Sequence, residues 1–148
     1  MTNKIKHFTS SALIIHNNKV LLIYHKKLDV WLYPGGHVEE NENPDETLIR
    51  EVKEETGLNV EIVSNKDESL ADKENDVSSL HIPFAILCEL VGDHYHNDLI
   101  YICKIKDREI KLKQNSEESD NIEFFSYNET VDLKLFDNFR VLLQKVLN

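Results

Sequence analysis

Basic residues, cysteines and long apolar runs are all scarce in this sequence, and the shortage of basic residues limits the ligands it can bind. The chain has 17 lysines and arginines against 27 acidic residues, so its formal net charge is −10. A surface of this sign argues against non-specific binding to nucleic acid, which needs basic patches to displace counterions. It keeps a cytosolic protein soluble, and it also suits a protein whose bound cation neutralises a polyanionic ligand.

The cysteines and the short apolar runs indicate a soluble, cytoplasmic protein. Cys88 and Cys103 lie in apolar, strand-like stretches without CxxC spacing, so we expect buried, reduced thiols. No stretch is long enough to cross a membrane, and the first ten residues lack the apolar centre of a signal peptide. The 148 residues show no repeat or linker, so we expect one domain over residues 1–148.

Alternating and apolar runs predict several strands around two helices. Asn17-Asn18 is a tight-turn signal between the first two strands, and residues 65–79 are polar enough to form a loop. Residues 136–147 have the apolar spacing of an amphipathic helix. This mixture favours an α+β or three-layer sandwich fold. The expected strands are 8–16, 19–25, 58–63, 80–91, 98–105, 109–112 and 122–126, and residues 31–33 lead into a glycine loop.

A second helix has clear start and stop signals. Asn43 is a good N-cap, Pro44 suits the first helical position, and Glu46 stands where it closes a capping box. Gly57 is a C-terminal stop, so the helix should run from about Pro44 to Thr56. Its apolar stripe should consist of Leu48, Ile49, Val52 and Thr56.

Three glutamates of this helix, Glu51, Glu54 and Glu55, share an arc beside the apolar stripe. Carboxylates this close repel one another, and Arg50 is a single cation placed four residues before Glu54. A hard divalent cation such as Mg²⁺ can neutralise the cluster and keep waters for the phosphates of a substrate. The alternative is a solvated acidic face on a surface helix, as most charge runs are.

The loop before the helix favours the metal site over the solvated face. The stretch Tyr33-Pro34-Gly35-Gly36-His37 contains paired glycines that let the backbone approach a ligand closely. Glu42 adds a carboxylate at the far end of this loop. The loop and helix together predict a metal-bound phosphate site.

Residues 36–58 read GHVEENENPDETLIREVKEETGL, and this stretch fills every defining position of the box of the Nudix hydrolases. The chain resembles this family over most of its length, since a PGG loop precedes the box and Glu123-Phe124-Phe125 is similar to a late acidic–aromatic strand start. The resemblance implies a Nudix-type α/β/α sandwich around a mixed β-sheet. It also implies a pyrophosphohydrolase that cleaves a nucleoside diphosphate linked to another group, with Mg²⁺ or Mn²⁺ as cofactor.

Carried over position by position, the resemblance makes Glu51, Glu54 and Glu55 metal ligands, with the carbonyl of Gly35 as a further one. Arg50 would orient the carboxylates, and Glu42 would brace the loop or bind the metal through water. The general base stays open between a helix glutamate, here Glu54, and a glutamate of a later loop. Glu118 is the candidate in that loop, with Glu117 and Asp120 as substitutes, and the alternative is a solvated acidic loop.

Basic side chains near the glycine loop are candidate substrate contacts. His25, Lys26 and the following Lys27 could meet phosphate, although a plain basic cluster at a hairpin end explains them equally well. His37 directly follows the two glycines, so its ring faces either the site or solvent. His81 has no assigned role, and His94-Tyr95-His96 without further ligands is better explained as a surface turn than as a metal tract.

Two other classes of function compete with a hydrolase. One is a catalytically silent sensor that binds a nucleotide in the same pocket, against which the complete set of box carboxylates counts. The other is an isomerase acting on prenyl diphosphates, which commonly needs a cysteine in the site. The expected partner is a small nucleotide derivative of unspecified identity, with no nucleic acid and no membrane. An exposed sheet edge or the C-terminal helix could support a homodimer.

Overall fold

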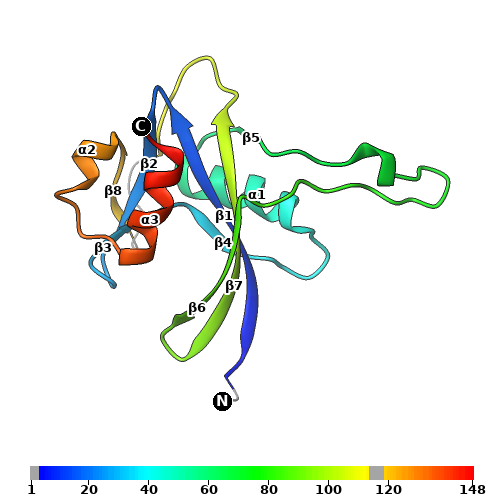
Figure 1. Cartoon of the computed structure of the whole chain (residues 1–148), viewed down its shortest axis with the longest axis horizontal. Helices are drawn as coiled ribbons and strands as arrows, with labels where there is room; N and C mark the ends of the chain where they lie inside the picture. Colours follow the sequence, from blue (N-terminus) through cyan, green and yellow to red (C-terminus); the bar gives the residue numbers. More distant parts are fainter. Residues whose placement is uncertain (1–3, 114–118) are drawn as a thin grey trace.

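The computed structural model describes residues 4–113 and 119–148, which form a mixed β-sheet with helices on its two faces (Figure 1). Eight strands and three α-helices occur in these residues. The strands are β1 (Lys6–His16), β2 (Lys19–His25), β3 (Val30–Leu32), β4 (Gly35–His37), β5 (Val60–Ile62), β6 (Ala85–Val91), β7 (His94–Ile105) and β8 (Ser119–Phe125). The helices are α1 (Pro44–Thr56), α2 (Tyr127–Thr130) and α3 (Asp137–Val146).

Each face of the sheet is covered by one of the longer helices, so the expected three-layer arrangement is confirmed. Successive residues of a strand point to opposite faces, and β1 follows this rule within its buried part. Leu13 packs in the same cluster as Phe139 and Leu143 of α3. Its neighbours Ala12 and Ile14 pack in the other cluster, which contains buried residues of α1. The sheet is therefore buried on both sides at its centre, which fixes α1 firmly against β1.

The long parallel pairing of β1 with β7 determines where the site lies. It runs from Lys6 opposite Tyr95 to Ile14 opposite Cys103. On its other side β1 pairs antiparallel with the short strand β4, which contains both loop glycines. β6 then pairs with the far edge of β7 as a hairpin around Gly92. Four strands in the order β4, β1, β7 and β6 thus form one continuous floor.

Most of the predicted elements are present, and the first hairpin and α1 match closely. Asn17 and Asn18 have φ values of 50° and 57°, as a tight turn between β1 and β2 requires. Asn43 and Glu46 form the predicted capping box, and Gly57 ends the helix with φ of 81°. The prediction that Ile49 belongs to the buried apolar stripe of α1 is wrong, because Ile49 is 40% exposed.

Four sequence-based assignments of the remaining chain are wrong. Residues 80–84 precede β6 rather than belong to it, and residues 109–112 form no strand, since Ile110 and Leu112 pack into the core cluster beneath α1. The polar stretch 94–98 is not a surface turn but the start of β7, because it pairs with β1. Cys88 is exposed instead of buried, while Cys103 is buried as expected.

A long excursion between β5 and β6 leaves the body of the molecule and returns to it (Figure 1). It contains the 3₁₀ turn η1 (Glu68–Leu70) and is held near its end by His81. The Nδ1 atom of His81 lies 2.7 Å from the Asp45 carboxylate, and its backbone amide donates to the same oxygen. His81 therefore fastens this excursion to the first turn of α1. None of the described helices is long and apolar enough to cross a membrane.

Candidate active site

The glycine loop lies between β1 and α1 at contact distance, and this packing requires both glycines. A Cβ on Gly35 would stand 2.5 Å from the carbonyl oxygen of Ser10, and one on Gly36 would stand 2.3 Å from Cδ of Glu51. The amide of Gly35 donates to Oε1 of Glu55 at 2.9 Å. The loop is thus joined to two of the three clustered glutamates, by a hydrogen bond to Glu55 and by direct contact with Glu51.

Arg50 is the centre of an ion-pair network that joins the loop to the helix. Its guanidinium donates two hydrogen bonds to the Glu42 carboxylate, at 2.9 and 2.6 Å, and one to Glu51 at 2.8 Å. The pair with Glu54 expected from the spacing is present but longer, at 3.3 Å. Arg50 also donates to the carbonyl of His37 at 3.3 Å. The paired, planar geometry towards Glu42 is the strongest contact of the network.

Glu42 acts as a brace of the loop. It accepts hydrogen bonds from the Thr47 hydroxyl at 2.8 Å and from the Glu39 amide at 3.2 Å, in addition to those from Arg50. The Arg50 guanidinium, helped by these donors, lowers the pKa of Glu42 to about 2. Glu42 is therefore ionised at neutral pH and is occupied by protein donors.

The three glutamates of the arc differ in their surroundings. Burial raises the pKa of Glu51, although the neighbouring Arg50 acts in the opposite direction. The side chain of Glu51 is 18% exposed, whereas that of Glu54 is 58% exposed. Glu55 is half-buried and lines the adjoining cavity. The arc thus presents carboxylate oxygen atoms that differ in exposure. Oxygen is the donor type that Mg²⁺ prefers.

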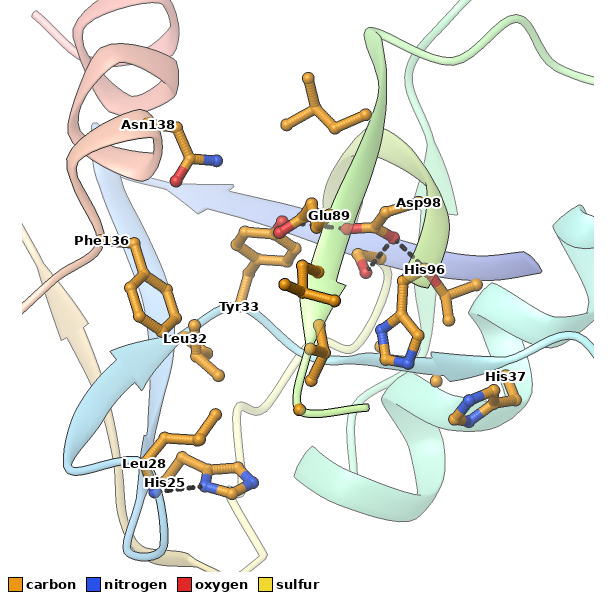
Figure 2. Close-up of a pocket in the computed structure, with 18 of the residues that line it drawn as sticks. His25, Leu28, Leu32, Tyr33, His37, Glu89, His96, Asp98, Phe136 and Asn138 are labelled. Atoms are coloured by element: carbon orange, nitrogen blue, oxygen red, sulfur yellow. Dashed lines mark hydrogen bonds between the residues drawn. The ribbon is translucent and has the colours of Figure 1, made fainter. Parts of the chain in front are cut away.

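A cavity of about 850 Å³ opens beside the glycine loop (Figure 2). Gly35, Gly36 and Glu55 form the side nearest the carboxylate cluster. The opposite wall contains Phe136 and Asn138 at the start of α3, and the hairpin of β6 and β7 closes a third side. Ligand pockets of small organic molecules have volumes of this order.

A pair of acidic side chains lies at the inner end of the cavity. Asp98 is 4% exposed, and its Oδ1 accepts hydrogen bonds from the hydroxyls of Thr9 at 2.8 Å and Ser11 at 2.7 Å. Its Oδ2 accepts one from Tyr33 at 3.0 Å. Burial, with the charge of Asp98 beside it, raises the pKa of Glu89 to about 7. Three hydroxyls donate to Asp98 and hold its carboxylate in place beside Glu89.

The raised pKa of Glu89 predicts a measurable effect of pH on stability. The folded protein keeps the Glu89 proton between about pH 4.5 and pH 7, while the unfolded chain loses it, so the free energy of unfolding falls as pH rises through this window. We expect Glu89→Gln to abolish this decline and to raise the free energy of unfolding at pH 8 by about 1–2 kcal/mol, a figure reduced for the partial exposure of the group.

Urea unfolding of wild type and Glu89→Gln at several pH values from 5 to 8 measures the difference between them. Glu61→Gln is the matched control, because Glu61 is an exposed glutamate on β5 whose side chain pairs with Lys104 at the surface. Parallel pH profiles of wild type and Glu89→Gln would show that Glu89 has no raised pKa in the folded state.

The structure brings together most, but not all, of the residues singled out in the sequence. Gly35, Glu55, His25 and His37 line the cavity, whereas Lys26 is exposed and is not among its lining residues. His25 accepts a hydrogen bond at Nδ1 from the Leu28 amide, 3.2 Å away. Glu118, the loop candidate for the general base, lies outside the described residues, as does Glu117.

The residues missed in the sequence are those on the cavity floor. Asp98 and Glu89 come from neighbouring strands, and Thr9 and Ser11 reach Asp98 only because β1 runs parallel to β7. One signal was available: Asp98 is a charged residue at the edge of an apolar run. A buried carboxylate in such a run needs partners, but the sequence does not show which strand supplies them.

The chain as a whole matches a known family. The model of the NUDIX domain matches residues 6–145, and the chain therefore belongs to the Nudix family. The crystal structure of a NUDIX-family hydrolase from Clostridium perfringens superposes with a TM-score of 0.81, at 31% identity and with 95% of each chain covered. A MutT NUDIX hydrolase from Burkholderia pseudomallei shares the fold, with a TM-score of 0.71 at 17% identity over 95% of this chain and 98% of that one.

Similarity to curated sequences extends over only part of each relative. A Lactococcus lactis protein named "Probable DHNTP pyrophosphohydrolase" is 33% identical over 108 residues, which are 72% of this chain and 58% of that protein. Nudix hydrolase 2 of Arabidopsis thaliana is 25% identical over 137 residues, 88% of this chain and 43% of that protein. The chain thus spans about half the length of these relatives.

Proposed function

We propose that the protein hydrolyses the pyrophosphate bond of a nucleoside diphosphate linked to another group, with Mg²⁺ or Mn²⁺ as the cofactor. The observation that carries this proposal is the packing of Glu51 and Glu55 against the glycine loop, with Glu54 beside them on the same helix, next to a cavity of about 850 Å³. Membership of the Nudix family and the names of its pyrophosphohydrolase relatives support the same reaction.

The donor atoms of the cluster fit a hard divalent cation. Arg50 is engaged mainly by Glu42 and Glu51, so the single guanidinium leaves net negative charge on the arc. Carboxylate oxygens of Glu51, Glu54 and Glu55, with the carbonyl of Gly35, would hold the metal. When bound, the metal neutralises pyrophosphate oxygens and increases the acidity of the attacking water.

The chain's own residues then orient the reaction. Gly36 and Arg50 fix the Glu51 carboxylate, and the Gly35 amide fixes that of Glu55, so two groups keep their positions before a substrate arrives. Glu54 is the most exposed of the three, and it can turn towards a water molecule or towards the metal. Glu54 and Glu118 remain the candidates for the general base, and Arg50 remains a positioning residue.

The cavity would hold the organic part of the substrate, with the pyrophosphate beside Gly35 and Gly36. His37 and His25 line it from two sides and could donate to phosphate oxygens. Lys26 stays a prediction as a further contact outside the cavity. The net charge of −10 supports a small substrate rather than nucleic acid, and the reduced thiols Cys88 and Cys103 fit a cytoplasmic location. A homodimer stays a prediction.

A hydrolysis screen tests the proposal. Purified protein is incubated with nucleoside triphosphates, nucleotide sugars, ADP-ribose and dinucleoside polyphosphates, with Mg²⁺ and in parallel with EDTA. We expect at least one class to be cleaved only with the metal, and the reaction in ¹⁸O-water to label a phosphate product. Binding of a nucleotide by calorimetry without any hydrolysis would instead make the protein a sensor.

A further inference from the structure

Four histidine rings meet at the mouth of the cavity, beside the glycine loop. His7 is on β1, His37 on β4, and His94 and His96 are on β7. The register of the sheet brings them to one face: His7 stands opposite His96, and His37 stands opposite Thr9, two residues after His7. Neighbouring strands of a rigid sheet therefore determine their positions.

The nitrogen atoms of three of these rings are close enough to share one ion. One ring nitrogen from each of His7, His37 and His94 lies within 4.8 Å of the others. Tetrahedral coordination at Zn–N distances of about 2.0–2.1 Å needs ligand nitrogens roughly 3.4 Å apart. Because His7 and His37 are exposed at their strand positions, small rotations of their side chains can close this difference.

His94 is already oriented as a metal ligand would be. Its Nδ1 lies 3.0 Å from the Asp93 carboxylate, which directs its Nε2 away from Asp93 and into the cluster. That Nε2 lies 3.0 Å from Nε2 of His96. His96 is thus placed to serve as a fourth ligand of the ion or to donate a hydrogen bond to another group bound to it. A carboxylate behind a ligating histidine is the usual arrangement in zinc sites.

From this geometry we infer a second metal site in the protein, made of His7, His37 and His94 with His96 beside them, which binds Zn²⁺ or a similar transition ion. Its donors are imidazole nitrogens, which suit Zn²⁺, Co²⁺ and Ni²⁺, whereas the arc on α1 offers oxygens that suit Mg²⁺. The two sites therefore select different metals. This inference does not rest on the proposed hydrolase function.

The site would join three strands at a functionally sensitive place. His37 directly follows Gly36, and His37 and His96 both line the cavity. A bound ion would fasten β4, and with it the glycine loop, to β1 and β7. The ion would therefore hold the mouth of the cavity in one arrangement.

Co²⁺ titration tests the inference, because tetrahedral Co²⁺ has a visible spectrum that reports nitrogen ligands. Metal-free full-length protein is titrated with Co²⁺ in excess Mg²⁺, which occupies the carboxylate site, and Zn²⁺ is then used to displace the Co²⁺. We expect one spectroscopically active equivalent. His7→Gln and His94→Gln should each weaken its binding on the order of 10- to 100-fold.

Two control variants separate this site from other histidines and from the carboxylates. His16→Gln changes a histidine at the opposite end of β1, and Glu54→Gln changes the most exposed carboxylate of α1. Both should bind the equivalent as wild type does. Equal affinity in wild type, His7→Gln and His94→Gln would overturn the inference, as would loss of the spectrum only in Glu54→Gln.

A measurement on the unchanged protein guards against misfolded variants. In a Zn²⁺ titration with excess Mg²⁺, the ¹⁵N resonances of the His7, His37 and His94 rings should shift together, while those of His16 and His81 should not. Shifts confined to other histidines would overturn the inference. In addition, Zn²⁺ should raise the thermal midpoint of wild type and His16→Gln but not that of His7→Gln.

Discussion

Glu54→Gln is expected to lower kcat of the metal-dependent hydrolysis on the order of 10³-fold, with little change in the free energy of unfolding. A metal ligand or base acts on the charge of the transition state, and several kcal/mol of stabilisation correspond to this factor. The fold should tolerate the change, because the Glu54 side chain is 58% exposed and its described ion pair with Arg50 is long, at 3.3 Å.

The comparison is made at saturating substrate over a range of Mg²⁺ concentrations. Glu40→Gln is a matched control, since Glu40 is an exposed glutamate of the loop before the same helix. A loss of activity that excess Mg²⁺ restores indicates a ligand, while a loss that persists indicates the base. Full activity of Glu54→Gln would contradict its place in the site.

Alanine substitutions at the two neighbouring loop glycines should have different effects: Gly36→Ala should mainly lower activity, and Gly35→Ala should mainly lower stability. In Gly36→Ala the three atoms nearest to the new methyl group belong to the end of the Glu51 side chain, at 2.3 to 2.7 Å, so the carboxylate must move while the backbone stays. We expect kcat/KM to fall on the order of 100-fold, since displacement of a positioned group by about 1 Å has this effect. In Gly35→Ala the methyl group meets backbone atoms of Ser10 and Ser11 at 2.5 and 2.8 Å. These atoms cannot move alone, so the variant should lose about 2–3 kcal/mol of stability.

Chemical unfolding and steady-state kinetics of both variants measure these effects side by side. Each variant serves as the control of the other, because the substitution is identical and the positions are adjacent in β4. Neither glycine has a positive φ, so any loss reflects crowding rather than backbone strain. Equal stability of Gly35→Ala and wild type would show that the loop can move away from β1.

The sequence predicted those parts of the site that depend on contacts between near neighbours. The capping box of Asn43 and Glu46, the stop at Gly57 and the shared arc of Glu51, Glu54 and Glu55 follow from helical periodicity over a few residues. Even here one contact is not the one that the spacing favours. Arg50 lies closer to Glu42, eight residues earlier, than to Glu54, four residues later. The loop that contains Glu42 folds back against α1, and the spacing of residues along the helix does not predict this contact.

Two segments adopt a structure that their composition does not indicate. The stretch 94–98 has the composition of a turn, yet pairing with β1 makes it a strand. Residues 109–112 have the composition of a strand, yet Ile110 and Leu112 pack beneath α1 while Lys113 donates to the Thr56 carbonyl. In both cases a partner far away in the chain outweighed the local preference.

By itself, then, the sequence determined the capped helix, the glycine loop and the family that these two elements identify, because their geometry arises within about twenty consecutive residues. Only the tertiary structure decided which other side chains face the cavity. The parallel register of β1 and β7 places Asp98 between Thr9 and Ser11, and it brings His7 to His94 and His96. Such a pairing joins residues about ninety positions apart, and no periodicity within either strand reveals its partner or its register.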